Sequence, residues 1–223
     1  MRALTAELTT GDLPDEVAVF PLSGAVLLPH GRLPLNIFER RYRMMIEDVM
    51  ADGRFMAMVQ PRSARTETVA DDGLMYDVGC LGRITAFTET DDGRFLITLF
   101  GLSRFRIIDE CAMRNGYRRI GVDFSDFQDD LAGDPVAGFV RQPFIDTLHA
   151  YFASHDIKGS WDALEKADER TLITSVAMAV PFSPEERQAI LECQSLAEQG
   201  ELLRSLMEMA VHEKQVAITS ARH

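Results

Sequence analysis

Two histidines in the second half of the chain are the first candidates for a metal site. His149 and His155 have Asp146 and Asp156 close by, and imidazole with carboxylate is an ordinary ligand combination for zinc. Six residues along a continuous helix amount to a rotation of about 600°, so the two rings would point away from each other. The pattern favours two partly exposed histidines near a helix end. We therefore expect no metal site and no cofactor.

Paired aspartates are the candidates for acid–base chemistry. Asp-Asp pairs occur at positions 71–72, 91–92 and 129–130. A catalytic pair needs burial to separate the pKa values of its two carboxyl groups. All three pairs lie in turn-like sequence, where burial is not expected. His30 follows Pro29 in a predicted loop, where we expect it to hydrogen-bond backbone rather than act as a general base.

Sequence motifs of the common catalytic machineries are missing. The chain has no GxxxxGK[ST] phosphate loop, no GxSxG nucleophile elbow and no HExxH zinc motif. Its cysteines, Cys80, Cys111 and Cys193, lie far apart without a CxxC pair, which argues against a disulfide framework and a structural zinc site. We predict no catalytic residues and a protein that is not an enzyme; an unrecognised hydrolase is the catalytic alternative.

Composition indicates an ordinary globular protein of 223 residues, 46% hydrophobic and 26% charged. The formal net charge of −12 repels phosphate backbones, so nucleic-acid binding is not expected. The longest apolar run, about ten residues around 173–182, is too short to cross a bilayer. No secretory signal is visible in residues 1–10, and we expect a cytoplasmic protein without membrane contact.

The predicted secondary structure, which must position the residues considered above, changes from strands to helices near residue 125. Before it, short extended runs at 17–22 and 55–60 precede two long strand-like runs joined by a hairpin turn at 91–93, and residues 117–124 close the set. Gly101 is expected to bend the second long strand. Tight turns between several strands suggest a small barrel or folded sheet.

One early helix is expected over 37–51, with Asn36 and Glu39 as a capping box and Phe38 on the apolar face. After residue 125 the period becomes helical. We expect a helix starting at Asp134 and kinked or divided at Pro143, a helix capped by Asp168, one capped by Ser183, and a last helix over about 196–215. The fold class is α+β, with a β-rich subdomain at 1–125 and a helical subdomain at 126–223.

Three stretches in order resemble the substrate-binding N-terminal domain of Lon proteases. The first is "VFPLSGAVLLPHGRLPLNIFERRYRMMIED"; the second, "GCLGRITAFTETDDGRFLITLFGLSRFRI", is similar to the family's strand–hairpin–strand; the third is "PFSPEERQAILE". The resemblance spans about residues 15–210. Residues at the family's motif positions, expected to be structural, are Pro21, Leu22, Pro29, Pro34, Gly82, Arg104 and Phe105.

The resemblance implies a PUA-like β-rich subdomain followed by a helical one. It also implies a free-standing member of the family without the ATPase and protease domains that complete a Lon protease. The function it implies is polypeptide binding without catalysis, as a possible adaptor in protein quality control. The candidate binding residues lie at the start of the early helix: Phe38, Glu39, Arg40, Arg41, Tyr42 and Arg43.

Other functions stay open. PUA-like folds elsewhere hold RNA, so a small-ligand or RNA-binding protein is the alternative, against which the acidity argues. Weak self-association through Met44, Met45 and Met50 is a further possibility, although methionines at helical spacing are more often core filler. Arg41 has two candidate partners, Glu39 or a carboxylate of the sheet.

Overall fold

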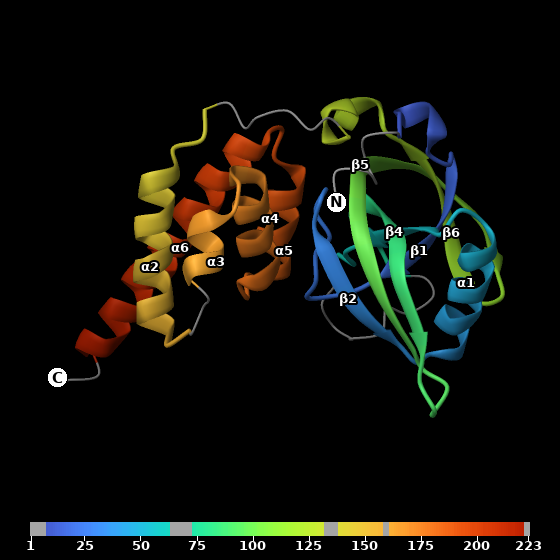
Figure 1. Ribbon diagram of the computed structural model, residues 1–223, viewed down its shortest axis with the longest axis horizontal. Coiled ribbons are helices and arrows are strands. Elements are labelled where there is room, and N and C mark those ends of the chain that lie inside the picture. The colour runs from blue at the N-terminus through green and yellow to red at the C-terminus, as the bar shows by residue number, and fades with distance from the viewer. Residues whose placement is uncertain (1–7, 63–72, 132–137, 158–160, 221–223) are drawn as a thin grey trace. The chain divides into compact units, whose positions relative to one another are not determined.

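The computed structural model describes residues 8–62, 73–131, 138–157 and 161–220, and the chain divides into two compact units. The sheet unit consists of Met1–Asp134 with Val180–Leu191, and the helical unit of Pro135–Ala179 with Glu192–His223. Figure 1 shows the strands gathered in the sheet unit and most of the helices in the other.

Six strands form one mixed sheet. They are β1 (Glu16–Pro21), β2 (Arg32–Ile37), β3 (Phe55–Val59), β4 (Val78–Glu89), β5 (Phe95–Arg114) and β6 (Tyr117–Asp123). Their order is β2-β5-β4-β3-β1-β6, with β1 and β3 parallel and the other pairs antiparallel. The 20-residue β5 pairs with β2 and β4 through its first half and with β6 through its second. The sheet therefore folds back on itself, which confirms the predicted folded sheet.

A bulge lies at Gly101, where the sequence predicts a bend. The β4–β5 register moves from Leu81 opposite Ser103 to Gly82 opposite Gly101, which leaves one extra residue in β5. A side chain at Gly101 would overlap the carbonyl oxygen of Leu28. The loop before β2 can therefore bond directly to the bulge, through the Gly101 N–H to the Gly31 oxygen at 2.9 Å. The prediction is confirmed, and the close loop is its physical reason.

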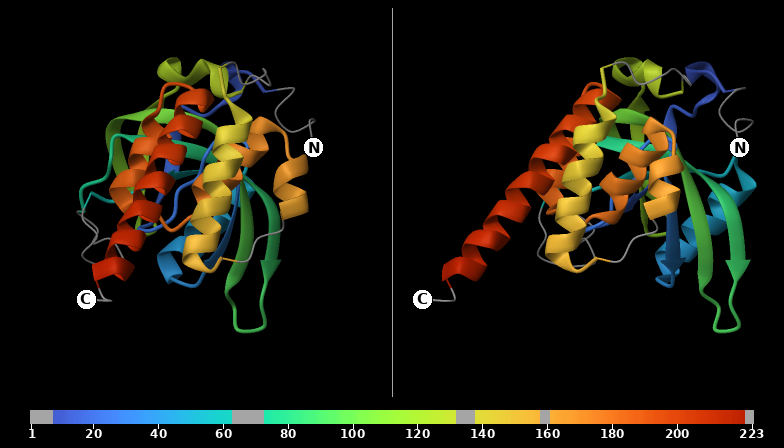
Figure 2. Two further views of the ribbon diagram at one scale, coloured as in Figure 1. Left: turned by 90° about the vertical axis from the view of Figure 1, so that its left-hand side faces the viewer. Right: turned by 60° about the vertical axis from the view of Figure 1, so that its left-hand side comes forward.

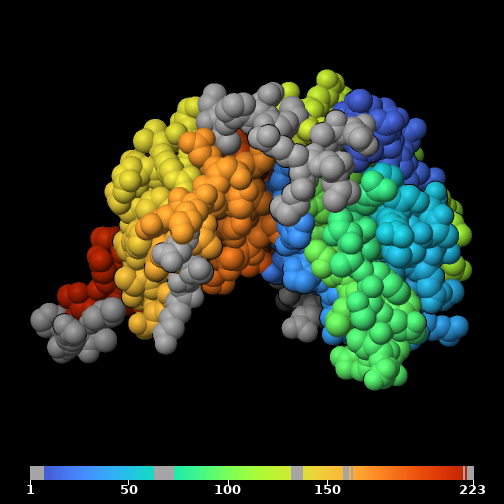
Figure 3. Space-filling model, viewed as in Figure 1, coloured from blue at the N-terminus to red at the C-terminus, as the bar shows by residue number. Residues whose placement is uncertain are grey.

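The predicted hairpin turn joins β4 to β5. The Thr90 N–H donates to the Arg94 oxygen at 2.9 Å, and Gly93 has a φ of 75°, which glycine adopts without strain. In the space-filling view the tip of this hairpin stands free at the lower end of the sheet unit (Figure 3).

Helix α1 (Arg40–Ala51) begins three residues later than predicted. Asn36 lies in β2 opposite Leu96, so it does not cap the helix, and Glu39 holds the N-cap position without a side-chain hydrogen bond. The predicted capping box is wrong because strand pairing continues through Ile37 and commits these backbone groups to the sheet. Phe38 is 63% exposed and does not belong to the buried helix face.

Two layers of apolar side chains stabilise the sheet unit. One packs inside the folded sheet around Val19, Leu81, Phe105 and Ile120. The other lies under α1, whose buried residues are Tyr42, Met45, Ile46 and Val49. Full burial of such a side chain contributes about 1.5–3 kcal/mol. Met45 is thus core, and Met44 and Met50 are half-buried.

The helical unit contains α2 (Arg141–His155), α3 (Trp161–Lys166), α4 (Glu169–Ala179) and α6 (Leu196–Ser220). Helix α2 lies beside α6, as both views of Figure 2 show. The core of this unit is made of side chains with no exposed surface: Leu148, Leu172, Ile173, Leu203 and Met207. Helix α3 was not predicted from the sequence.

Helix α2 starts at Arg141 and not near residue 134. The predicted cap, Asp134, and the adjoining Pro135 lie outside the described residues. Pro143 is the third residue of the helix, where the backbone N–H would have no intrahelical acceptor in any case. The predicted kink at Pro143 is therefore wrong.

Helix α5 (Pro184–Glu192) packs on the sheet, although the sequence grouped it with the helices. Ser183 caps the helix as predicted, and Glu186 completes a capping box with bonds of 2.7 and 3.2 Å. Farther along, Gln188 donates to the carbonyl oxygen of Val78 at 3.1 Å and accepts from Gln60 at 3.1 Å. Contacts therefore place residues 180–191 with the sheet. The division into two domains at 1–125 and 126–223 stays a prediction.

In the part of the chain that the structure describes, no helix has the length and apolar character needed to cross a membrane.

Candidate functional site

The two histidines considered for a metal site each make local contacts. The His149 ring stacks on Trp161 with 3.7 Å between centroids, and its Nε2 lies 3.9 Å from the Glu165 carboxylate. His155 places Nδ1 3.0 Å from the carbonyl oxygen of Tyr151. Within the described residues, no three His, Cys, Asp or Glu side chains are grouped to hold a metal ion.

The aspartate pairs have different surroundings. Asp92 accepts hydrogen bonds from Arg94 and Thr90, which hold the pKa of its carboxyl well below the usual range. Residues 71–72 lie outside the described residues. In the third pair Asp129 is exposed but Asp130 is buried. The expectation that turns leave all these carboxylates exposed is therefore wrong for Asp130, because η2 (Ser125–Asp130) packs on β5.

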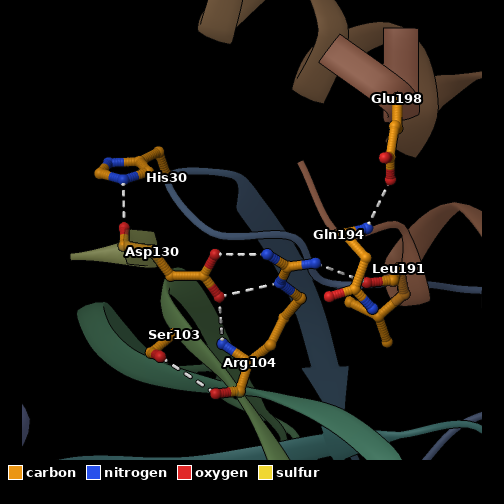
Figure 4. Close-up of polar contacts among 7 residues, drawn as sticks. All are labelled: His30, Ser103, Arg104, Asp130, Leu191, Gln194 and Glu198. Carbon is orange, nitrogen blue, oxygen red and sulfur yellow. Dashed lines mark hydrogen bonds and ion pairs between the residues drawn. The ribbon is translucent and has the colours of Figure 1, made fainter. Parts of the chain in front are cut away.

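The buried carboxylate of Asp130 is paired with Arg104 (Figure 4). Arg104 donates from Nη2 at 2.7 Å, from Nε at 2.9 Å and from its backbone N–H at 2.8 Å. Its Nη1 donates to the carbonyl oxygen of Leu191 at 3.1 Å, at the end of α5. The His30 Nε2 lies 2.8 Å from the backbone oxygen of Asp130. The carboxylate is satisfied by its neighbours, so the cluster joins three segments of the sheet unit rather than presenting a reactive group.

The candidate binding residues at the start of α1 differ in burial and in their contacts. Tyr42 is buried with its ring edge-on to Phe20, 4.5 Å between centroids. Arg41 bonds Glu39 at 3.3 Å, one of the two partners the sequence offered. Arg43 stacks on Phe95, with 5.3 Å from its guanidinium carbon to the ring centroid.

Phe38 and Arg40 remain exposed. Of the six candidates, these two therefore offer the most surface to a partner.

Most residues at the motif positions lie inside the sheet unit. Pro21 ends β1, and the Leu22 N–H donates to the Val59 oxygen at 3.1 Å. Pro29 is buried in the loop before β2. Phe105 has no exposed surface, and a Cβ at Gly82 would lie 2.8 Å from Leu27.

A surface on strands β2, β5 and β4 was missed by the sequence reasoning. Two rows of paired residues cross these strands: Pro34–Thr98–Ala86 and Asn36–Leu96–Thr88. Phe38 directly follows the last residue of β2 and is 63% exposed, and we group it with these two rows because it lies two residues after Asn36. We call these seven residues the open face. Leu96 is 45% exposed, and none of the seven is charged; Asn36 and Leu96 also line a hollow whose other walls include the charged residues Asp91, Asp92 and Arg94.

The open face was hidden in the sequence because β2 was not recognised as a strand. Pro34 argues against a central strand, and the run "LPLNIF" was assigned to the approach of a helix. Leu96 alternates with Phe95 and Ile97 in a run that is apolar on both faces, a pattern typical of a strand covered on both sides. An exposed leucine beside an edge strand follows only from the pairing of β2 with β5.

Strand β2 lies at one end of the strand order and is an edge of the sheet. Pro34 has no N–H to donate, and a proline in an edge strand hinders the addition of another strand by backbone pairing. Contact through side chains such as Phe38 and Leu96 is therefore favoured over strand addition.

Comparison with known proteins agrees with this fold. Residues 16–209 match the family described as the ATP-dependent protease La (LON) substrate-binding domain. The Lon protease of Desulfosudis oleivorans is 33% identical over 98 residues, which are 44% of this chain and 12% of that protein. The Lon protease of Escherichia coli K12 is 23% identical over 211 residues, 90% of this chain and 26% of that protein. The chain thus spans a minor part of these relatives.

Two solved structures share the fold. The Lon N-terminal domain protein from Xanthomonas campestris has a TM-score of 0.57 and 21% identity over 85% of this chain and 97% of that one. The N-terminal domain of the Mycobacterium avium complex Lon protease has a TM-score of 0.59 and 14% identity over 86% of this chain and 98% of that one. The family match covers most of the chain, and it is to the substrate-binding domain alone. The chain belongs to the Lon substrate-binding domain family.

Proposed function

We propose that this protein binds exposed apolar segments of other polypeptides without catalysis, in the cytoplasm, through its open face. Membership of a substrate-binding domain family supports a binding role. The observation that carries the site is an exposed patch of uncharged side chains that includes Phe38 and Leu96 and is bordered by Asp91, Asp92 and Arg94. Exposed apolar patches with polar rims are typical of interaction surfaces.

The chemistry of the open face defines what it would bind. Phe38 and Leu96 provide apolar contact, while Thr88, Thr98 and Asn36 offer short hydrogen-bonding groups without charge. Such a surface suits unfolded or misfolded segments, in which apolar side chains and backbone are both accessible. An adaptor role in protein quality control follows if the bound chain is then passed to an ATP-dependent protease.

The test is a titration of the full chain with a permanently unfolded model protein, such as reduced and carboxymethylated α-lactalbumin carrying a fluorophore. We expect saturable binding with a Kd of about 10–100 μM, the range of weak recognition. An apolar unfolded peptide should compete, and a highly acidic disordered peptide of equal length should not. Binding that does not saturate, or that both peptides displace equally, would contradict the proposal.

A further inference from the structure

A cavity of about 220 Å³ lies in the sheet unit, apart from the open face. Its walls come from the start of β1 and the turn before it, the end of α1 with the start of β3, and the β5–β6 turn. Ligand pockets for drug-sized molecules are larger, roughly 300–1,000 Å³. The cavity therefore suits a single long side chain better than a cofactor.

The lining of the cavity includes apolar residues held in the core. Leu13, Val17 and Val49 line it and are almost fully buried, and Phe55 is half-buried beside them. The aliphatic stem of a side chain that enters would leave the water and pack against these groups. This burial favours binding by about 25 cal/mol for each Å² of apolar surface removed from water.

The charged groups of the lining do not balance. Four carboxylates, those of Asp12, Glu16, Asp48 and Asp52, share the lining with two guanidinium groups, so the lining carries two negative charges in excess. Both arginines are engaged: Arg114 lies 3.2 Å from Asp48, and Arg119 pairs with Glu16.

The excess negative charge rests on two residues. Asp12 accepts bonds from the backbone N–H and the hydroxyl of Thr9, which lower the pKa of its carboxyl and keep it ionised. Asp52 is the C-cap residue of α1. Among the described residues neither Asp12 nor Asp52 has a cationic partner.

Two further features favour a cation at this place. The cavity lies at the C-terminal end of α1, where the helix dipole is negative and stabilises positive charge. The Tyr117 hydroxyl donates to Asp48 at 2.7 Å, and burial together with that bond raises the pKa of Tyr117 to about 12. Tyr117 therefore stays neutral and adds no competing charge.

We propose that this cavity binds the side chain of an arginine or lysine from a bound polypeptide, with its aliphatic stem against Leu13 and Val17 and its charged head toward Asp12 and Asp52. The proposal rests on the proposed function in one respect, that the cation arrives on a polypeptide. It adds a selectivity for basic residues that the uncharged open face does not have.

Two peptides that differ in one residue test the charge requirement. Both are Gly-Ser chains, one with a central arginine and the other with citrulline, which keeps the shape and removes the charge. Titration of the full chain by NMR should show several-fold tighter binding of the arginine peptide, with shifts at Val17, Val49 and Tyr117. Equal affinities for the two peptides would overturn the proposal.

A matched pair of variants separates the cavity from the overall negative field. Asp52→Asn removes a charge that lines the cavity, and Glu47→Gln removes one from an exposed position of α1 outside it. We expect Asp52→Asn to weaken binding of the arginine peptide roughly two- to fivefold, the range of exposed ion pairs, and Glu47→Gln to leave it unchanged. Equal weakening by both variants would show long-range attraction only and would contradict the proposal.

Binding of the unfolded model protein distinguishes the two proposals. If that protein binds and the arginine peptide does not, the cavity proposal alone fails. If the arginine peptide binds and Leu96→Asp leaves binding of the unfolded protein unchanged, the open face fails as the binding site and the cavity stands.

Discussion

Arg104 and Arg106 lie two residues apart in β5, and each pairs with an aspartate of η2 in a different environment. The side chains of Arg104 and Asp130 are 7% and 8% exposed, while those of Arg106 and Asp126 are 52% and 54% exposed. A buried charge that loses its partner keeps its desolvation penalty, whereas an exposed one is returned to water. The two pairs therefore differ in their expected contribution to stability.

We predict that Arg104→Met lowers the free energy of unfolding by about 3–5 kcal/mol, because it removes the guanidinium that pairs with the buried Asp130 carboxylate and donates to the Leu191 carbonyl oxygen. Arg106→Met is the matched control and should cost about 0–1 kcal/mol. Urea unfolding followed by circular dichroism measures both. Similar losses for the two variants would contradict a structural role for the buried pair.

Tyr117 gives a second prediction, in alkaline solution. Burial and the bond to Asp48 raise the pKa of Tyr117 from 10.0 to about 12 in the folded protein. Because the pKa of Tyr117 is higher in the folded than in the unfolded protein, its protonated hydroxyl stabilises the fold. This contribution is complete below pH 10 and is lost as the pH rises through 12. The midpoint temperature of thermal unfolding should therefore decrease as the pH rises from 10 to 12. Tyr117→Phe should remove part of that decrease.

Tyr76→Phe is the control for this measurement, because among the described residues the side-chain bonds to Asp48 come from Arg114, Asn115 and Tyr117 and not from Tyr76. It should retain the alkaline loss of the natural protein. If Tyr117→Phe and Tyr76→Phe gave the same profile between pH 10 and 12, the bond to Asp48 would not control the titration of Tyr117.

At the scale of elements, α5 is the part of the second half on which the sheet depends. Gln60 and Gln188 are buried and bonded to each other, and Gln188 also satisfies the carbonyl oxygen of Val78. Buried polar groups that lose their partners cost about 1–3 kcal/mol each. The sheet and α5 are therefore expected to fold together.

A chain of residues 1–125 should accordingly fail to show a cooperative thermal transition, because it lacks both α5 and Asp130. Adding a peptide of residues 180–193 to a chain of residues 1–134 should raise the transition temperature of that chain. The same peptide with Gln188→Ala should do so less. A cooperative transition of the 1–125 chain alone would contradict this dependence.

Local signals predicted the elements that depend on neighbouring residues. The hairpin at 91–93, the bulge at Gly101 and the caps at Asp168 and Ser183 follow from glycine conformations and short-range hydrogen bonds, and all are present. The resemblance added the fold of the sheet. These features are set within a few residues of sequence.

Features set by distant pairing could not be predicted in this way. Strand β2 exists because β5 pairs with it, and this pairing removed Asn36 from the expected cap and exposed Phe38. Asp130 is buried by Arg104, 26 residues away. The open face and the cavity both combine segments that are far apart in sequence.

At the scale of the whole molecule, the two proposed binding sites both belong to the sheet unit. The open face suits apolar side chains and the cavity suits basic ones. The open face is uncharged, and the cavity carries an excess of two negative charges in a chain of net charge −12. Acidic proteins attract basic partners over long range and repel nucleic acids. We therefore expect polypeptides with apolar segments and basic residues to bind this protein more tightly than RNA.

The central claim is that the open face binds unfolded polypeptide, and a pair of substitutions in β5 tests it most directly. Leu96→Asp places a charge on the open face, and Ile108→Asp places one at another exposed apolar position of the same strand. Affinity for carboxymethylated α-lactalbumin should fall at least tenfold with Leu96→Asp, about 1.4 kcal/mol, and stay within twofold with Ile108→Asp. Equal affinity of both variants and the natural protein would contradict the claim.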